Sequence, residues 1–309
     1  MDLSIVATLY KSAAYIEEFH RRASAVAREL AGDDYEVILV NDGSPDNSLD
    51  LAVRLSETDE HVTVVDLSRN FGHHKAMMAG LGQTTGAKVF LVDSDLEEEP
   101  EWLLEFSKQM STDGCDVVFG VQKKRKGDWF ERLTGWVFYI IVNAVTGFSF
   151  PRNSVTARLM TRRYLDALML HQEREISIGG LFIITGFDQR PQPINKHGTN
   201  PTTYTLRHKM AVMVDSITSF SNKPLVSIFY VGGLILAFSS LYIVYLILNR
   251  LVYSSLISGW TSVMASIWFL GGLIISFIGL VGIYLSKIFT ETKRRPNSII
   301  REVYGGHKS

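Results

Sequence analysis

Two long segments of the sequence carry no charged residue, and they constrain the fold more than any other feature. The first is Leu225–Leu248, and the second is Leu251–Ser286, whose best candidate span runs from about Thr261 to Ser286. About 20 apolar residues cross the ~30 Å hydrocarbon core of a bilayer. A soluble core helix of this length would need more surrounding protein than the remaining residues supply. The segments therefore predict two transmembrane helices within residues 224–289.

Charged residues flank the predicted spans unevenly, and this asymmetry predicts an orientation. The link between the spans carries only Arg250, whereas a basic tail at 290–309 follows the second span. Two spans place residues 1–223 and the tail on the same side, which the positive-inside rule assigns to the cytoplasm. The single cysteine, Cys115, excludes an internal disulfide and fits a reducing compartment. We therefore expect a multi-pass protein of the cytoplasmic membrane. Glycines in its spans permit close helix packing, so a homo-oligomer is possible.

Residues 1–200 alternate short apolar runs with helical spacing, which is typical of an α/β domain. The predicted strands are Leu3–Leu9, Tyr35–Val40, Val62–Leu67, Val89–Val92, Asp116–Val121, Ser154–Met160 and an edge strand at Phe187–Ile194. The predicted helices are Ser12–Leu30, Asp46–Glu57, Lys75–Leu81 and Arg162–Leu170. This order predicts a mostly parallel sheet with right-handed crossovers. The formal net charge of -1 gives no sign of a nucleic-acid partner.

Polar side chains recur where the predicted strands end. In chain order they are Thr8 and Tyr10, Asp42, Asn70, and the pair Asp93 and Asp95. Parallel topology brings these ends to one edge, where open α/β sheets bind their ligands. Two carboxylates one residue apart suit a hard divalent cation, which in turn suits a diphosphate. The alternative is that Asp93 and Asp95 are solvated turn residues.

A cationic cluster and two amphipathic segments separate the sheet residues from the predicted spans. Lys123–Lys126 precedes an aromatic-rich helical pattern at Trp129–Ile141, which fits a helix at a membrane surface. A helix packed against the sheet is the alternative. Leu206–Phe220 carries a second amphipathic pattern. We therefore interpret 201–223 as a juxtamembrane helix and residues 1–200 as the domain before it.

Three motifs, in this order and at this spacing, resemble family 2 glycosyltransferases with the GT-A fold. They are VNDGSPDNS at 40–48, LSRNFGHHKAMMAGL at 67–81 and LVDSDLEEEPE at 91–101. The later ITSFSNKPL at 217–225, the two spans and KRRP at 293–296 narrow the resemblance to polyisoprenyl-phosphate glycosyltransferases. That branch includes bactoprenol glucosyltransferases and dolichyl-phosphate mannosyltransferases. The resemblance covers nearly the whole chain.

The resemblance implies a site for a nucleoside diphosphate sugar and a divalent cofactor, Mg2+ or Mn2+. Asp95 would hold the metal against the diphosphate, and Asp93 would lie near the ribose and the metal. Arg125 would bind the diphosphate or an acceptor phosphate, and Glu97 or Glu98 would be the base for a hydroxyl acceptor. The remaining donor-site candidates are Thr8, Tyr10, Asp42, Asn70, Lys75, Ser94 and Lys196.

The resemblance further implies a reaction. A sugar would be transferred from a nucleoside diphosphate, UDP in preference to GDP, to a polyisoprenyl phosphate such as undecaprenyl phosphate, with inversion at the anomeric carbon. The reaction would take place at the cytoplasmic face of the membrane and would serve cell-envelope glycans. The alternatives are a hydroxyl acceptor, or a non-catalytic membrane scaffold that keeps the fold. The residues themselves argue against dinucleotide and P-loop enzymes, because neither glycine-rich phosphate loop is present.

Overall fold

The computed structural model describes residues 1–122, 145, 151, 153–174, 178–195, 214, 217–218, 221–253 and 259–306. The chain divides into two compact units. One contains the sheet and consists of Met1–Tyr139, Phe148–Tyr204 and Arg294–Ser309. The other contains two long helices and consists of Ile140–Gly147 and Thr205–Lys293.

The sheet has eight strands in the order β7-β5-β6-β4-β1-β2-β3-β8. Their bounds are β1 Leu3–Leu9, β2 Tyr35–Asn41, β3 Val62–Leu67, β4 Lys88–Leu91, β5 Val117–Gln122, β6 Ser154–Thr161, β7 Gln189–Ile194 and β8 Ile300–Gly305. The four strands β4-β1-β2-β3 are parallel, and β7 is parallel to β5. Only β6 and β8 run antiparallel to their neighbours among the described strands. The predicted α/β class with a mostly parallel sheet is therefore confirmed.

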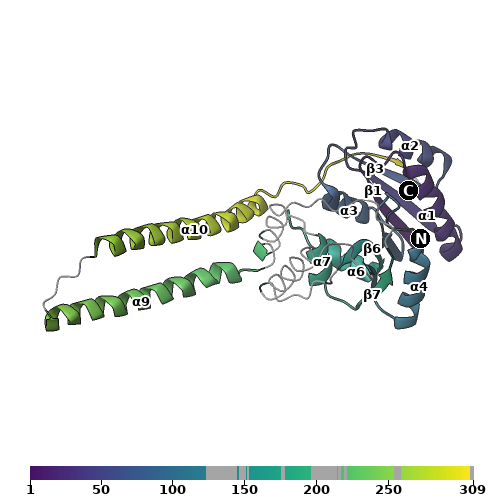
Figure 1. Cartoon of the computed structure of the whole chain (residues 1–309). Helices are drawn as coiled ribbons and strands as arrows, with labels where there is room; N and C mark the ends of the chain where they lie inside the picture. The colour runs from purple at the N-terminus through teal and green to yellow at the C-terminus, as the bar shows by residue number, and fades with distance from the viewer. Residues whose placement is uncertain are drawn as a thin grey trace. The chain divides into compact units, whose positions relative to one another are not determined.

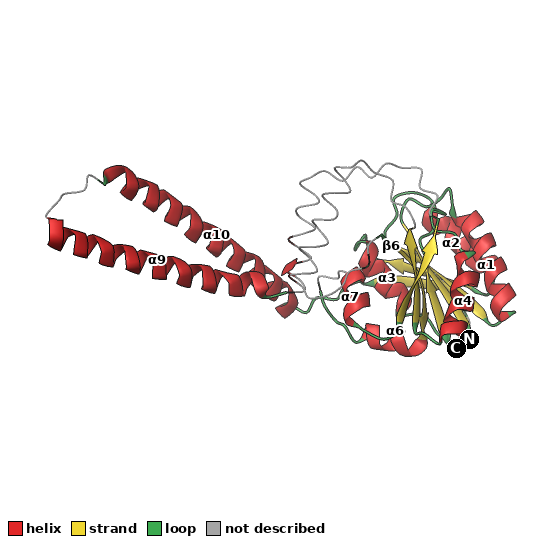
Figure 2. Cartoon of the chain, turned by 60° about the horizontal axis from the view of Figure 1, so that its bottom comes forward, coloured by secondary structure: helices red, strands yellow, loops and turns green. Residues whose placement is uncertain are grey.

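Helices cover both faces of this sheet, which explains why β1 and β2 are buried along their whole length. The helices are α1 Ile16–Ala31, α2 Ser48–Thr58, α3 His73–Leu81, α4 Trp102–Asp113, α6 Arg162–Met169 and α7 Ile178–Ile184. One core packs the sheet against α1, α2 and α4, and the other packs it against α3, α6 and α7 (Figure 2). Gly80 brings α3 close to the strands, since a Cβ there would lie 2.6 Å from Val40.

Strand β8 is the main departure from the sequence analysis, which assigned 290–309 to a basic tail. Ile300–Gly305 instead pairs antiparallel with β3 and forms one edge of the sheet. Figure 1 shows this segment returning to the sheet unit, close to β3. The other edge is β7, as the prolines Pro191 and Pro193 predicted, because a proline cannot donate to a neighbouring strand.

The helical unit contains α9, Lys223–Tyr253, and α10, Trp260–Thr292. The hydroxyl of Tyr284 on α10 donates a 2.7 Å hydrogen bond to the carbonyl of Ser221, just before α9. Among the described residues, Phe269–Thr292 is the one helical segment long and apolar enough to cross a membrane, and none of its most apolar window is buried. The apolar part of α9, Lys223–Ser239, is shorter. One of the two predicted spans thus has support and the second is not confirmed.

Candidate functional site

The carboxyl ends of β1, β2, β3 and β4 lie at the same edge of the sheet. Leu9 pairs with Asn41, Asn41 pairs with Asp66, and Leu91 pairs with Val6. This register places the polar residues that follow each strand beside one another, as the sequence predicted. The site is built from the end of β1 and from the loops after β2, β3 and β4.

Asp93 follows β4 and meets a histidine from another element. Nε2 of His73, the first residue of α3, lies 3.4 Å from Asp93 Oδ1. Nδ1 of the same ring lies 3.1 Å from Thr8 Oγ1 at the end of β1. Burial alone would lower the pKa of His73, but the Asp93 carboxylate outweighs it, with smaller contributions from Glu98 and Asp42, and the pKa is raised. The ring thus connects the ends of β1 and β4.

Asp42 follows β2, and both of its carboxylate oxygens accept hydrogen bonds from the protein's own backbone. Its Oδ1 accepts a 2.7 Å hydrogen bond from the amide of Phe71, and its Oδ2 accepts one of 3.0 Å from Gly72. Its carbonyl accepts the side-chain amide of Asn70 at 3.0 Å. Asp42 and Asn70 therefore hold the loop that leads into α3. Gly43 is required at this crossing, because its φ is +58° and a Cβ would lie 2.5 Å from the Asn70 nitrogen.

Asp46 fixes the next turn of the β2 loop. Its carboxylate accepts hydrogen bonds from the hydroxyls of Ser44 and Ser48, both at 2.5 Å, and from the amide of Ala13 at 3.2 Å. Burial would raise the pKa of Asp46, but these hydrogen bonds lower it to about 2. From the sequence, Asp46 was expected only to begin the helix Asp46–Glu57. The serines two residues to either side were the signal for this larger network.

The acidic loop after β4 contains residues with different surroundings. Ser94 is buried and donates to the Thr8 carbonyl at 2.8 Å, which ties β4 to β1. Asp95 is exposed, and its Oδ1 accepts the Glu97 amide at 3.0 Å. Glu98 is buried and accepts the Thr156 amide of β6 at 3.0 Å. Asp95 is therefore the carboxylate that the loop turns toward solvent.

Asp93 and Asp95 fit a divalent cation of the kind bound together with a diphosphate. The Asp93 side chain keeps 22% of its surface exposed, and Asp95 is exposed in the same loop. Within the described part of the chain, no group of three or more metal-binding side chains exists. Mg2+ needs only one or two carboxylates from the protein when phosphate oxygens and water complete its shell. The donor set is therefore suitable for such a metal and unsuitable for a closed protein cage.

Arg158 of β6 lies buried behind the acidic loop, and the sequence analysis missed it. Its guanidinium stacks on the Phe182 ring at 3.2 Å and donates to the Thr156 carbonyl at 3.2 Å. Burial lowers the pKa of Arg158 to about 10, although the charge of Glu98 acts in the opposite direction. An arginine within the apolar run from Ala157 to Met160 was the signal that could have identified it.

The other predicted site residues have less defined places. Tyr10 is exposed beside the end of β1, and Lys75 and Glu97 are partly buried. Arg125 and Lys196 lie outside the described residues, as do the cationic cluster, the segment Trp129–Ile141 and all of Leu206–Phe220 except Val214, Ile217 and Thr218. The structure therefore brings together Thr8, Asp42, Asn70, Asp93 and Ser94, with Asp95 on the same loop.

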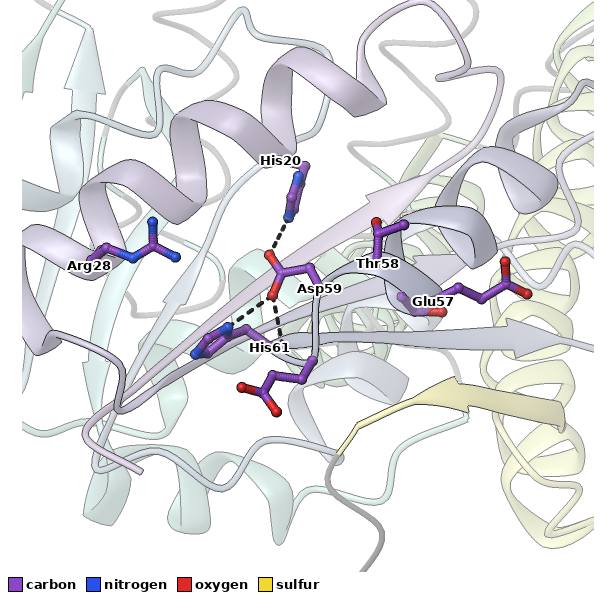
Figure 3. Close-up of a pocket in the computed structure, with 8 residues that line it drawn as sticks. His20, Arg28, Glu57, Thr58, Asp59 and His61 are labelled. Atoms are coloured by element: carbon purple, nitrogen blue, oxygen red, sulfur yellow. Dashed lines mark hydrogen bonds and ion pairs between the residues drawn. The ribbon is translucent and has the colours of Figure 1, made fainter.

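A pocket of about 650 Å³ lies at the amino end of β3, away from these loops (Figure 3). The Asp59 carboxylate lies 2.9 Å from His20 Nε2 of α1 and 2.9 Å from His61 Nδ1. Burial would raise the pKa of Asp59, but hydrogen bonds from His61 and His20 lower it. These contacts join α1 to the turn before β3, which accounts for the cluster as a structural clamp.

Comparison with known proteins finds a family model and several curated relatives. The model described as glycosyl transferase family 2 matches residues 4–169. A protein of Mycobacterium tuberculosis named as putative glycosyltransferases is 51% identical over 99% of this chain and 89% of its own length. The uncharacterized glycosyltransferase YkcC of Bacillus subtilis is 32% identical over 99% of this chain and 95% of its own. An undecaprenyl-phosphate 4-deoxy-4-formamido-L-arabinose transferase of Serratia proteamaculans is 29% identical over 98% of this chain and 94% of its own.

A solved structure supports the fold. The mannosyltransferase PcManGT of Pyrobaculum calidifontis, in complex with GDP-Man and Mn2+, aligns with a TM-score of 0.50 and 18% identity. The alignment covers 70% of this chain and 63% of that protein, so it spans less than two thirds of that protein's length.

Proposed function

The chain is a member of glycosyl transferase family 2, and we propose that it moves a sugar from a nucleoside diphosphate sugar to a polyisoprenyl phosphate at a membrane surface. The convergence of Thr8, Asp93 and Asp95 at the carboxyl edge of a GT-A-like sheet carries this proposal. The name of the Serratia relative supports the acceptor, since it specifies undecaprenyl phosphate. UDP is the preferred carrier in this proposal, and cell-envelope glycans are the preferred destination.

In the proposed donor site, the chain's residues bind and orient the diphosphate. Asp95, which is exposed, and Asp93, which is held at the sheet edge, would hold Mg2+ or Mn2+. When bound, the metal neutralises negative charge on the leaving nucleoside diphosphate. Thr8 and Tyr10 at the end of β1 would face the nucleoside. Asp42 and Asn70 contribute by fixing the loop before α3, because their hydrogen bonds are made within the chain.

The proposed acceptor makes a strong base unnecessary. A lipid phosphate is already anionic, so its oxygen can attack the anomeric carbon directly and the displacement inverts that carbon. A hydroxyl acceptor would instead need a general base, and Glu97 would then be the candidate in the loop beside Asp95. We assign acceptor binding to Arg125 and keep Lys196 in the donor site, since cationic side chains suit both the lipid phosphate and the diphosphate.

We place the sheet unit at the cytoplasmic face of the membrane. The apolar segment Phe269–Thr292 supports one span, and α9, a helix of 31 residues, is proposed as the second. Lys293, Arg294 and Arg295 follow α10, and basic residues at this position favour the cytoplasmic side.

A donor and acceptor screen tests the proposal. The full chain in nanodiscs would be incubated with radiolabelled UDP-sugars and GDP-sugars, undecaprenyl phosphate, and Mg2+ or Mn2+. We expect label in the lipid fraction for at least one UDP-sugar and no label in EDTA. Transfer only to a hydroxyl acceptor, or to none of the lipids, would contradict the proposed acceptor. Binding of donors with neither transfer nor hydrolysis would favour the non-catalytic scaffold.

A further inference from the structure

His73 lies between two residues of the proposed donor site without being assigned a role in it. One ring nitrogen faces Thr8 Oγ1 at 3.1 Å, and the other faces Asp93 Oδ1 at 3.4 Å. We infer that His73 is a positioning residue that holds the Asp93 carboxylate so that its Oδ2 atom is presented to the bound donor. This inference rests on the proposed function and adds to it a residue that acts through Asp93.

The chemistry of the two partners determines which ring nitrogen carries the hydrogen. An ionised carboxylate can only accept, so the nitrogen that faces Asp93, Nε2, must donate. In the neutral ring Nδ1 is then an acceptor, and the Thr8 hydroxyl is its donor. Thr8 is buried in β1, so its hydroxyl has a fixed position. The ring is therefore oriented from the strand side.

The carboxylate is constrained by the same contact. Asp93 Oδ1 is buried, and no group other than His73 is positioned to neutralise it within the described residues. The side chain as a whole keeps 22% of its surface exposed. Oδ2 is consequently the oxygen available to a ribose hydroxyl or a metal. The 3.4 Å separation is longer than an ordinary hydrogen bond, and contacts of this kind shorten when the substrate binds.

The backbone around His73 is fixed independently. Gly72 precedes α3 with a φ of +98°, a conformation that favours glycine. The Asp42 carboxylate accepts the amides of Phe71 and Gly72, so the start of α3 cannot rotate freely. This explains why Asp42 points into the loop although it follows β2 at the ligand edge. Asp42 fixes the backbone at the start of α3, and this backbone fixes the position of His73. His73 in turn orients the Asp93 carboxylate.

Two substitutions separate the contacts of the ring. The amide nitrogen of glutamine can occupy the place of Nε2, so His73→Gln keeps the donor to Asp93. The shorter asparagine can reach only the place of Nδ1, so His73→Asn loses that donor. His74→Asn is the matched control, because His74 is the next residue of α3 and is exposed. Thr8→Val provides a second route, since it removes the hydroxyl that orients the ring and keeps the shape.

The test measures UDP affinity by calorimetry in Mg2+ and in EDTA, together with the melting temperature, on the full chain in detergent. We expect His73→Asn to weaken UDP binding in Mg2+ by about tenfold, as losses of residues that orient metal ligands do. Thr8→Val should weaken it by a smaller factor. His73→Gln and His74→Asn should stay near wild type, and all melting temperatures should remain close.

Every other outcome would overturn the positioning role of His73, the proposed function, or both. Equal losses in His73→Gln and His73→Asn, or a loss that follows the melting temperature, would overturn the positioning role in favour of a structural one. Unchanged affinity in His73→Asn would also overturn it. If the wild-type protein binds UDP but transfers no sugar to undecaprenyl phosphate, the proposed function is refuted. The effect of the His73 substitutions on UDP affinity could still be interpreted. Wild type that binds no nucleoside diphosphate would refute both.

Discussion

Asp42 and Asp95 each follow a parallel strand, yet their carboxylates meet different surroundings. Asp42 is buried and accepts two backbone amides, whereas Asp95 is exposed on the acidic loop. A buried amide that loses its acceptor costs about 1–3 kcal/mol. At the residue scale, similar positions in the sequence pattern therefore predict opposite effects of mutation.

Asp95→Ala should abolish transfer and leave the melting temperature nearly unchanged, because Asp95 is proposed to hold the metal and its side chain is exposed at the point where it accepts the Glu97 amide. Asp42→Ala should lower the free energy of unfolding by about 1–3 kcal/mol, because the amides of Phe71 and Gly72 lose their acceptor. Melting curves and transfer assays on both variants check this pair. Retained turnover in Asp95→Ala with Mg2+ would remove it from the site.

Asp46 predicts a dependence of stability on pH. Its pKa in the folded protein is about 2, below the ordinary value of 3.8, so the ionised form stabilises the fold. That contribution is present above about pH 4 and is lost as the pH falls toward 2. We expect Asp46→Asn to cost about 1–2 kcal/mol at pH 7, after discounting for partial exposure. Urea unfolding at pH 7 and pH 2.5 should show the difference between variant and wild type shrink, and an unchanged difference would contradict the assignment.

At the scale of elements, β8 supplies the cation for a buried aspartate. Arg301 Nη1 donates to Asp66 Oδ2 at 3.0 Å, and Asn41 Nδ2 donates to Asp66 Oδ1 at 2.7 Å. Asp66 is 1% exposed, whereas Arg301 is 55% exposed. Asn41 in turn accepts the amide of Ser44, so the contact reaches the β2 loop of the site.

Arg301→Gln should therefore destabilise the sheet unit by about 1–3 kcal/mol, since a buried carboxylate would lose its charged partner. Arg295→Gln is the matched control, because Arg295 is exposed and precedes β8. Thermal unfolding of the two variants in the same detergent checks this. Equal melting temperatures would mean that Asn41 alone satisfies Asp66.

The elements differ in how far sequence could predict them. The parallel strands and their helices follow from alternating patterns, and β1, which is buried along its whole length, requires cover on both faces. The antiparallel direction of β6 and the pairing of β8 do not follow, because residue patterns do not encode which strand is the neighbour. The strand-end residues were predictable from topology. The link through His73 was not, because it depends on where α3 begins and how one ring turns.

At the scale of the whole molecule, the sheet unit is assembled from segments that come before and after the two long helices in the sequence. Removing residues 224–309 would delete β8 together with the helices. A chain of residues 1–204 joined by a Gly/Ser linker to residues 294–309 should melt several degrees higher than residues 1–204 alone. The reason is that it keeps the β3 partner and Arg301. Identical melting curves would show that β8 is dispensable.

The return of β8 to the sheet also sets an order of events during synthesis. Arg301 and its partner Asp66 are 235 residues apart, so β3 leaves the ribosome long before its neighbour exists. Until then, β3 presents an open row of amides and carbonyls that can pair with other chains. The nascent protein must insert or shelter α9 and α10 before the β3 edge is closed. The nascent chain can therefore aggregate through β3 for as long as the helical unit takes to be translated and placed. Slowing that step should lower the yield of folded protein before it lowers the activity of the molecules that do fold.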